Sequence, residues 1–197
     1  ATPPTAAAGG DQEQCNSGTF VLAANAATPG TGTWTIQGAA NGATITNVNS
    51  PTSTVTGLTA GNSVTLRWTI TNGSCTTNDD VVLTNSQLPT TANAGANQEK
   101  CNDGNFTLAG NTPSPGNGTW SIVSAANGAS ITTPSSPTST VTGLTPGYSV
   151  TLRWTITNGS CSNYDEVILT NSATPPTAAA GGDQEQCNSG TFVLAAN

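Results

Sequence analysis

The chain contains no histidine and only three basic residues, against ten acidic ones. The absence of histidine excludes Ser-His-Asp and Cys-His catalysis and histidine-based metal sites. With a formal net charge of −7, the chain has too few cations to neutralise a row of phosphates, which excludes nucleic acid as a partner. No apolar run approaches the ~18 residues of a membrane span, so we expect no membrane insertion in this segment. We therefore expect a protein that is not an enzyme and holds no cofactor.

The sequence repeats itself with a period of 86 residues. Cys101 follows Cys15 by 86 positions, and residues 173–197 repeat residues 1–25 letter for letter. A fixed long period is typical of a repeat array. We predict one domain over residues 1–86, a second over 87–172 and the start of a third over 173–197, in a window of a longer chain.

The alternation of apolar and polar residues predicts β-strands. Apolar residues occupy every second position from Val64 to Ile70, which predicts a half-buried strand over 63–71. Asn72 and Gly73 follow as a hairpin signal, and the return strand is expected over 80–84. Shorter strands are predicted over 18–23, 32–36, 43–46 and 53–56. About seven short strands per repeat, separated by turn residues, predict an all-β fold of β-sandwich domains in a linear array.

The apolar positions of the first repeat predict one core. We expect the two tryptophans to lie in it, since Trp68 shares its face with three aliphatic residues. A sugar-stacking platform is the alternative interpretation of these rings. The predicted core residues are Phe20, Leu22, Trp34, Ile36, Ile45, Val55, Leu58, Val64, Leu66, Trp68, Ile70 and Leu83.

Five cysteines in such a chain favour two pairs and one remaining residue. We predict a disulfide within each repeat, Cys15–Cys75 and Cys101–Cys161, and a partner for Cys187 outside the window. Closing so long a loop would stabilise a domain by roughly 4 kcal/mol in the chain-entropy model. A bridge between repeats or chains, and free thiols, are the alternatives. Disulfides indicate an oxidising compartment, so we expect an extracellular or cell-surface location.

Acidic residues cluster in sequence near the cysteines of the first repeat. Asp11 and Glu13 precede Cys15, and Asp79 and Asp80 follow Cys75. If the predicted disulfide formed, these four carboxylates would converge, and oxygen-rich clusters can bind Ca²⁺. The alternative interpretation is that they are solvated acids at the ends of loops and strands.

The order of these motifs resembles a known family. The segments DQEQC (residues 11–15) and TNGSC (residues 71–75), with GTF, GTW and the strand 63–71 between them, resemble the PKD-like or immunoglobulin-like tandem repeats of large bacterial surface proteins, such as the adhesin-like proteins of gliding bacteria. The resemblance covers both full repeats and the partial third. It implies a secreted, cell-surface β-sandwich that serves as a spacer or stalk unit and carries no catalytic residues.

The leading hypothesis is a structural repeat of a giant extracellular fibre or of an adhesin stalk. Its expected partners are neighbouring repeats of the same or identical chains, with a glycan or surface ligand bound through other domains. In a variant, the segment 3–10 completes the sheet of a neighbouring repeat. The alternative function is a carbohydrate- or host-binding module, for which Tyr148 and Tyr164 are the candidate aromatic residues.

Overall fold

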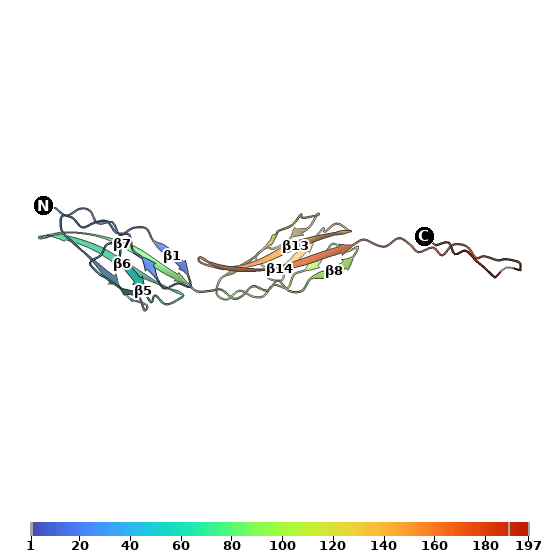
Figure 1. The fold of residues 1–197 in the computed structure, drawn as a ribbon, viewed down its shortest axis with the longest axis horizontal. Coiled ribbons are helices and arrows are strands. Elements are labelled where there is room, and N and C mark those ends of the chain that lie inside the picture. The colour runs from blue at the N-terminus through green and yellow to red at the C-terminus, as the bar shows by residue number, and fades with distance from the viewer. Residues whose placement is uncertain (1, 189, 197) are drawn as a thin grey trace.

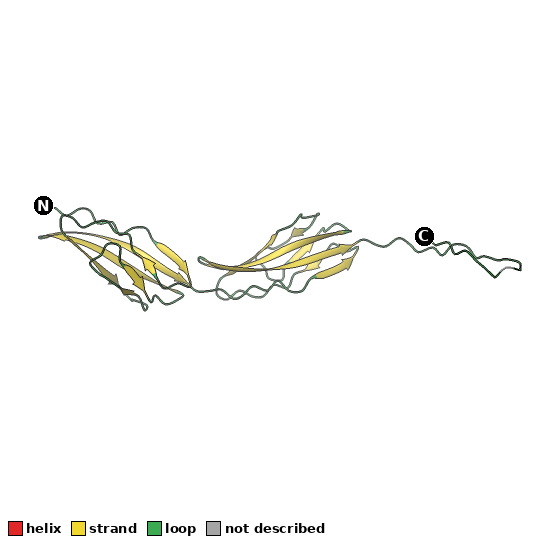
Figure 2. Ribbon diagram, in the orientation of Figure 1, coloured by secondary structure: helices red, strands yellow, loops and turns green. Residues whose placement is uncertain are grey.

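The computed structural model describes residues 2–188 and 190–196, and these residues form strands and loops but no helix (Figure 2). The strands gather into two bodies that follow one another along the long axis of the molecule (Figure 1). The described residues after Ser172 extend beyond the second body and contain no strand. Within the described part of the chain, no helix has the length and hydropathy needed to cross a membrane.

Seven strands form each body, as the sequence predicted. In the first repeat they are β1 (Gln12–Cys15), β2 (Phe20–Val21), β3 (Thr31–Gln37), β4 (Thr44–Ile45), β5 (Thr54–Thr56), β6 (Asn62–Asn72) and β7 (Cys75–Ser86). In the second repeat they are β8 (Gln98–Cys101), β9 (Phe106–Thr107), β10 (Asn117–Ile122), β11 (Ser130–Ile131), β12 (Thr140–Thr142), β13 (Tyr148–Asn158) and β14 (Cys161–Ser172).

Each body is a two-layer sandwich, which confirms the predicted fold class. In the first repeat, a four-stranded sheet of order β1-β7-β6-β3 packs on a three-stranded sheet of order β2-β5-β4. The second repeat has the same arrangement, with β10-β13-β14-β8 in one layer and β11-β12-β9 in the other. The two copies of the sequence therefore fold into the same topology.

The longest hairpin lies where the alternation and the Asn-Gly pair predicted it. Strands β6 and β7 pair in antiparallel register from Asn62 opposite Asn85 to Asn72 opposite Cys75. Strand β7 begins five residues before the predicted start. The first half of the strand is mostly exposed on both faces. A strand without a buried face carries no apolar alternation, so the sequence gives no signal of where it starts.

Strand β1 was not predicted, and its pairing decides where the cysteines lie. It runs parallel to the end of β7, with Gln12 opposite Leu83 and Cys15 opposite Ser86. Strand β8 repeats this pairing on β14, where Cys101 lies opposite Ser172. The first and last strands of each repeat thus finish together at the C-terminal end of its sandwich.

The extended segment before β1 packs on its own repeat. The amide of Ala6 donates to Thr77 Oγ1 at 3.1 Å, and the amide of Ala8 donates to Asp79 Oδ2 at 2.8 Å. Both alanine side chains are buried in the core of the first sandwich. The alternative in which the segment 3–10 completes a neighbouring sheet is therefore wrong for this structure.

The predicted core is confirmed in position and nearly in full. Ten of its twelve residues are buried, and Ile36 and Ile45 pack on the core while remaining partly exposed. Trp34 and Trp68 are 1% and 0% exposed, and their ring centroids lie 5.0 Å apart. Tryptophans buried to this degree cannot present a sugar-stacking face, so their role is core packing.

A glycine makes room for each buried tryptophan pair. A Cβ atom on Gly32 would overlap the six-membered ring of Trp68, and one on Gly118 would overlap Trp154 in the same way. Neither glycine has a positive φ, so the constraint is steric contact rather than backbone conformation. Close packing of the indole on the neighbouring strand β3 therefore depends on the missing side chain.

We expect Gly32→Ala to destabilise the first sandwich by about 1–3 kcal/mol, since an added methyl group in a packed core forces the ring to shift. Chemical denaturation monitored by tryptophan fluorescence measures this change. Gly10→Ala is the matched control, because a Cβ atom there meets no atom within 4 Å. Equal stability of the two variants would contradict the packing described for Gly32.

Candidate functional site

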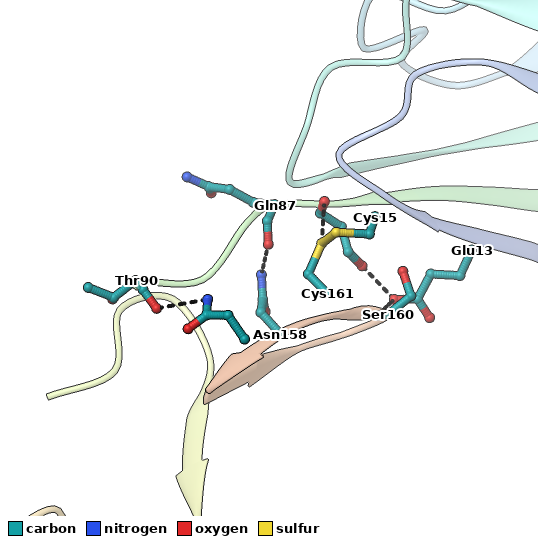
Figure 3. Close-up of a disulfide and its surroundings, with 9 residues drawn as sticks. Glu13, Cys15, Gln87, Thr90, Asn158, Ser160 and Cys161 are labelled. Atoms are coloured by element: carbon teal, nitrogen blue, oxygen red, sulfur yellow. Dashed lines mark hydrogen bonds between the residues drawn. A yellow bond between two sulfur atoms is a disulfide. The ribbon is translucent and has the colours of Figure 1, made fainter. Parts of the chain in front are cut away.

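A disulfide between the two repeats is the most distinctive site in the molecule. It joins Cys15, at the end of β1, to Cys161, at the start of β14, with a Cα–Cα distance of 4.8 Å (Figure 3). The predicted pairs Cys15–Cys75 and Cys101–Cys161 are therefore not the ones this structure forms. Both kinds of alternative left open by the sequence are observed: Cys15–Cys161 is a bridge between repeats, and Cys75, Cys101 and Cys187 are free thiols.

The parallel pairing of β1 explains why a bridge within a repeat cannot form. Cys15 lies opposite Ser86 at the end of β7, whereas Cys75 is the first residue of that 12-residue strand. At ~3.3 Å per residue the two cysteines are roughly 35 Å apart. A disulfide requires Cα atoms within about 7 Å. Each of the two full repeats thus carries one cysteine at each end, so a bridge has to join two different repeats.

Cys15 belongs to a small polar surface that we call the socket, formed by Glu13, Cys15 and Ser86. The hydroxyl of Ser86 donates to Glu13 Oε1 at 2.5 Å, which links β1 to the end of β7. Glu13 and Cys15 point to the same side of β1 because side chains alternate along a strand. The socket therefore presents a carboxylate and a sulfur atom toward the following repeat (Figure 3).

The socket receives the hairpin turn of residues 158–161, which we call the plug. The amide of Ser160 donates to Glu13 Oε1 at 2.8 Å, and Asn158 Nδ2 donates to the Gln87 carbonyl oxygen at 2.8 Å (Figure 3). Cys161 Sγ lies 3.4 Å from the carbonyl oxygen of Ser86, and the Cys161 side chain is fully buried. The disulfide is thus one contact of a fitted junction.

Gly159 is the residue of the plug that allows this fit. Its φ of +55° lies in the left-handed region, and a Cβ atom there would overlap Glu13 Oε1 and Ser86 Oγ. Glycine satisfies both requirements, since it adopts positive φ at no steric cost and brings no side chain. The Asn-Gly pair predicts a hairpin turn in the first repeat, but the sequence carries no signal that the same turn in the second repeat contacts its neighbour.

The charge of Glu13 is stabilised by the junction. The Ser86 hydroxyl, followed by the Ser160 amide, holds the pKa of Glu13 below its ordinary value of 4.5, while the smaller effect of burial raises it. Both donors favour the ionised carboxylate. Because one of them comes from the next repeat, the protonation state of Glu13 is linked to the docking of the plug.

The linker between the two sandwiches is held by the second repeat. The amide of Ala92 donates to Asn163 Oδ1 at 2.6 Å, and Asn163 Nδ2 donates to the carbonyl oxygen of Thr90 at 3.2 Å. Pro89 is buried, and Ala92 and Ala94 belong to the core of the second sandwich. The linker thus has defined contacts on the repeat that it enters.

The four acidic residues of the calcium hypothesis have separate contacts. Asp80 forms a two-point ion pair with Arg67 at 2.8 Å, and Asp79 accepts the Ala8 amide. Asp11 accepts the Val82 amide, and Glu13 belongs to the socket. Across residues 2–188 and 190–196 no three acidic, cysteine or histidine residues form a group that could hold a metal. The structure gives the calcium hypothesis no support.

The two tyrosines of the carbohydrate hypothesis lie apart on one hairpin. Tyr148 pairs with Asn171 at one end of the β13–β14 ladder, and Tyr164 pairs with Thr155 near the other. Tyr148 and Thr155 lie seven positions apart on β13, which is roughly 24 Å. Both rings are exposed, and Tyr164 stacks with the Arg153 guanidinium at 3.8 Å from the ring centroid. The two rings cannot contact one sugar together.

A surface hollow of about 650 Å³ lies beside the first tryptophan pair. Its lining includes Gly32, Asn49, Pro51 and Trp68, with alanine, threonine and glycine elsewhere. No acidic or basic side chain is among the described residues of this lining.

Comparison with known proteins supports the fold. No described protein family matches the sequence, and the search of curated proteins found no relative. Extracellular domains 3–5 of Drosophila OTK align over 88% of this chain and 60% of theirs, with 13% identity and a TM-score of 0.58. The I-band fragment I67–I69 of titin aligns over 97% of this chain and 83% of its own, with 14% identity and a TM-score of 0.50. The chain therefore folds as tandem immunoglobulin-like domains.

We expect a non-reduced tryptic digest of the Cys187→Ser chain, in which Cys161 is the only cysteine after Arg153, to identify the disulfide directly. The three basic residues, Arg67, Lys100 and Arg153, allow cleavage into 1–67, 68–100, 101–153 and 154–197. The observed bridge links 1–67 to 154–197, whereas bridges within repeats would link 1–67 to 68–100 and 101–153 to 154–197. Mass spectrometry distinguishes the two patterns, and the second pattern would contradict the junction.

We expect Glu13→Gln to lower the midpoint of thermal unfolding at neutral pH. Since the folded-state pKa is below the ordinary 4.5, the stabilisation is present above pH 4.5 and is lost as the pH falls through the lower folded-state value. The difference between the wild type and the variant should therefore shrink in that acidic range. Calorimetry across the range measures it, with Asp183→Asn in the exposed tail as the control. A difference that does not change with pH would contradict this role of the charge.

Proposed function

We propose that this chain is a non-catalytic structural segment of an extracellular fibre or cell-surface stalk. Residues 1–86 and 87–172 are its successive modules, and residues 173–197 begin a third. The observation that carries the proposal is the Cys15–Cys161 bridge, which joins adjacent modules instead of stapling one module internally. A bond in this position fixes how one module follows the next.

The bridge provides a short covalent route for tension along the array. A force on the chain ends passes through residues 1–15, crosses to Cys161 and continues along β14 to Ser172. Strand β14 is extended and runs the length of its sandwich (Figure 1). The route leaves out residues 16–160, which contain most of both hydrophobic cores. Tension can therefore be carried without unfolding either sandwich.

The contacts around the bridge limit bending between the modules. The plug is bonded to Glu13 and to the backbone of Gln87, and the linker is bonded to Asn163. The second repeat therefore contacts both the first repeat and the linker, and these contacts restrict rotation of one module relative to the other about the linker. A series of such junctions would form a semi-rigid rod, which suits a spacer or stalk.

The chemistry of the chain supports an extracellular place for this rod. A disulfide persists in oxidising surroundings, which cytosolic proteins do not meet. The resemblance of the DQEQC and TNGSC segments to repeats of large bacterial surface proteins agrees with that location. We therefore propose secretion to a bacterial cell surface, with ligand recognition left to other domains.

We expect electron microscopy of the native full-length protein to show thin rods with a regular axial repeat. From Cys75 to Cys101 the chain crosses two modules in 26 steps, so at ~3.3 Å per residue each module should advance by roughly 40 Å. Treatment with a reductant should increase the bending of the rods without changing this spacing. Compact particles without an axial repeat would contradict the proposed function.

A further inference from the structure

Besides the filled junction, the molecule carries a second socket that has the same construction. Glu99 Oε1 accepts the hydroxyl of Ser172 at 2.5 Å, as Glu13 accepts that of Ser86. The Cys101 thiol lies exposed at the end of β8, opposite Ser172. Glu99, Cys101 and Ser172 therefore form a set at the end of the second repeat. This set corresponds to the socket residues that contact the plug at the end of the first repeat.

The backbone of the second socket is already set in the same form. The amide of Asn102 donates to the Ser172 carbonyl oxygen at 2.8 Å, and Asn16 makes the same bond to Ser86. Asn102 and Asn16 have φ values of 51° and 47°. Lys100 points away from Glu99 and Cys101 because side chains alternate along β8, and its ammonium is bonded to Asp103 at 3.0 Å. The second socket thus matches the filled one in its backbone bond, in its glutamate–serine bond and in the position of its cysteine.

A second plug lies at the opposite end of the molecule. Residues 71–75 have the sequence TNGSC, and residues 157–161, which include the filled plug, have the same five residues. Gly73 has a φ of +63°, close to the +55° of Gly159, and a Cβ atom on it would meet no atom within 4 Å. The Cys75 thiol beside it is exposed. The plug of the first repeat is thus shaped for a socket and is not docked in one.

We propose that the Glu99–Cys101–Ser172 socket is a docking site for the TNGSC turn of a further copy of this repeat, to which it becomes joined by a disulfide from Cys101. The inference rests on the proposed function, because it extends the observed junction to both ends of the chain. The occupant is a repeat because the filled junction shows which group fits. In the filled junction, the turn places its glycine against the glutamate carboxylate of the socket and donates its serine amide to that carboxylate. Its cysteine forms the disulfide with the cysteine of the socket.

Formation of this bond requires an oxidised disulfide as the electron acceptor. The Cys101 thiolate attacks one sulfur of the acceptor, such as oxidised glutathione, and one thiol leaves. The cysteine of the incoming plug then displaces the second thiol from the mixed disulfide. Two thiols of the protein become one disulfide, and the acceptor is reduced to two thiols, so electrons and protons balance.

The second bond would complete a second covalent route through each module. In the second repeat, the observed bridge loads β14 from Cys161 to Ser172. A bond at Cys101 would also load the linker and β8, which pairs in parallel with the end of β14. Two extended strands in hydrogen-bonded register would then share the tension across each module.

The test is oxidative coupling of the Cys187→Ser chain, which retains Cys75 and Cys101 as its exposed free thiols. The protein is concentrated in a buffer of reduced and oxidised glutathione, and the covalent dimers are separated without reductant and digested with trypsin. We expect dimers linked mainly between 68–100 and 101–153, which contain Cys75 and Cys101. If Cys75–Cys75 and Cys101–Cys101 links formed as often as random collision of the thiols predicts, the proposal would be overturned. The absence of covalent dimers would overturn it as well.

A variant of the socket separates docking from simple thiol reactivity. Glu99→Ala should reduce the yield of Cys75–Cys101 links at least threefold, because the acceptor for the plug amide is lost. Asp183→Ala removes the same charge from the exposed tail and should leave the yield unchanged. An equal yield from Glu99→Ala and Asp183→Ala would overturn the proposal. The same digest reports the link between 1–67 and 154–197, so failure of this inference is distinguishable from failure of the proposed function.

Discussion

The parallel pairing of the first strand with the end of the last strand is the constraint on which the rest of the structure depends. It places Cys15 opposite Ser86, and therefore at the far end of the sandwich from Cys75. A module built in this way cannot close its own disulfide. It can only give one cysteine to the module that follows and the other to the module that precedes. For the two described repeats, strand direction therefore explains why the observed bridge joins different modules.

This arrangement changes what the disulfide contributes. A bridge inside one sandwich would restrict the unfolded chain of that sandwich. The observed bridge instead encloses a loop with a sequence separation of 146 residues that spans parts of two sandwiches, and it is accompanied by the hydrogen bonds of Glu13, Ser160 and Asn158. It links the mechanical behaviour of neighbouring modules while each keeps its own core.

The sequence predicted the sandwich well and its junction poorly, for a physical reason. Alternation located β6 and most of the core, because burial of one face imposes a period of two on residues such as Leu66 and Trp68. Strand β1 has no such pattern, since Gln12–Cys15 has no fully buried side. Its parallel pairing joins residues about 71 positions apart, and no local pattern records that contact. Because the sequence does not reveal this pairing, the spacing of the cysteines predicts bridges within repeats. For the same reason, the sequence places Glu13 in an acidic cluster.

Pulling single molecules by their ends is the measurement that tests the covalent junction most directly. With the Cys15–Cys161 bridge intact, the enclosed loop of sequence separation 146 cannot extend, so the account predicts no release of its length at any force below bond rupture. With Cys161→Ser, both sandwiches should unfold and release roughly 500 Å of chain at ~3.5 Å per residue. The same release from the oxidised wild type and from the variant would contradict the account.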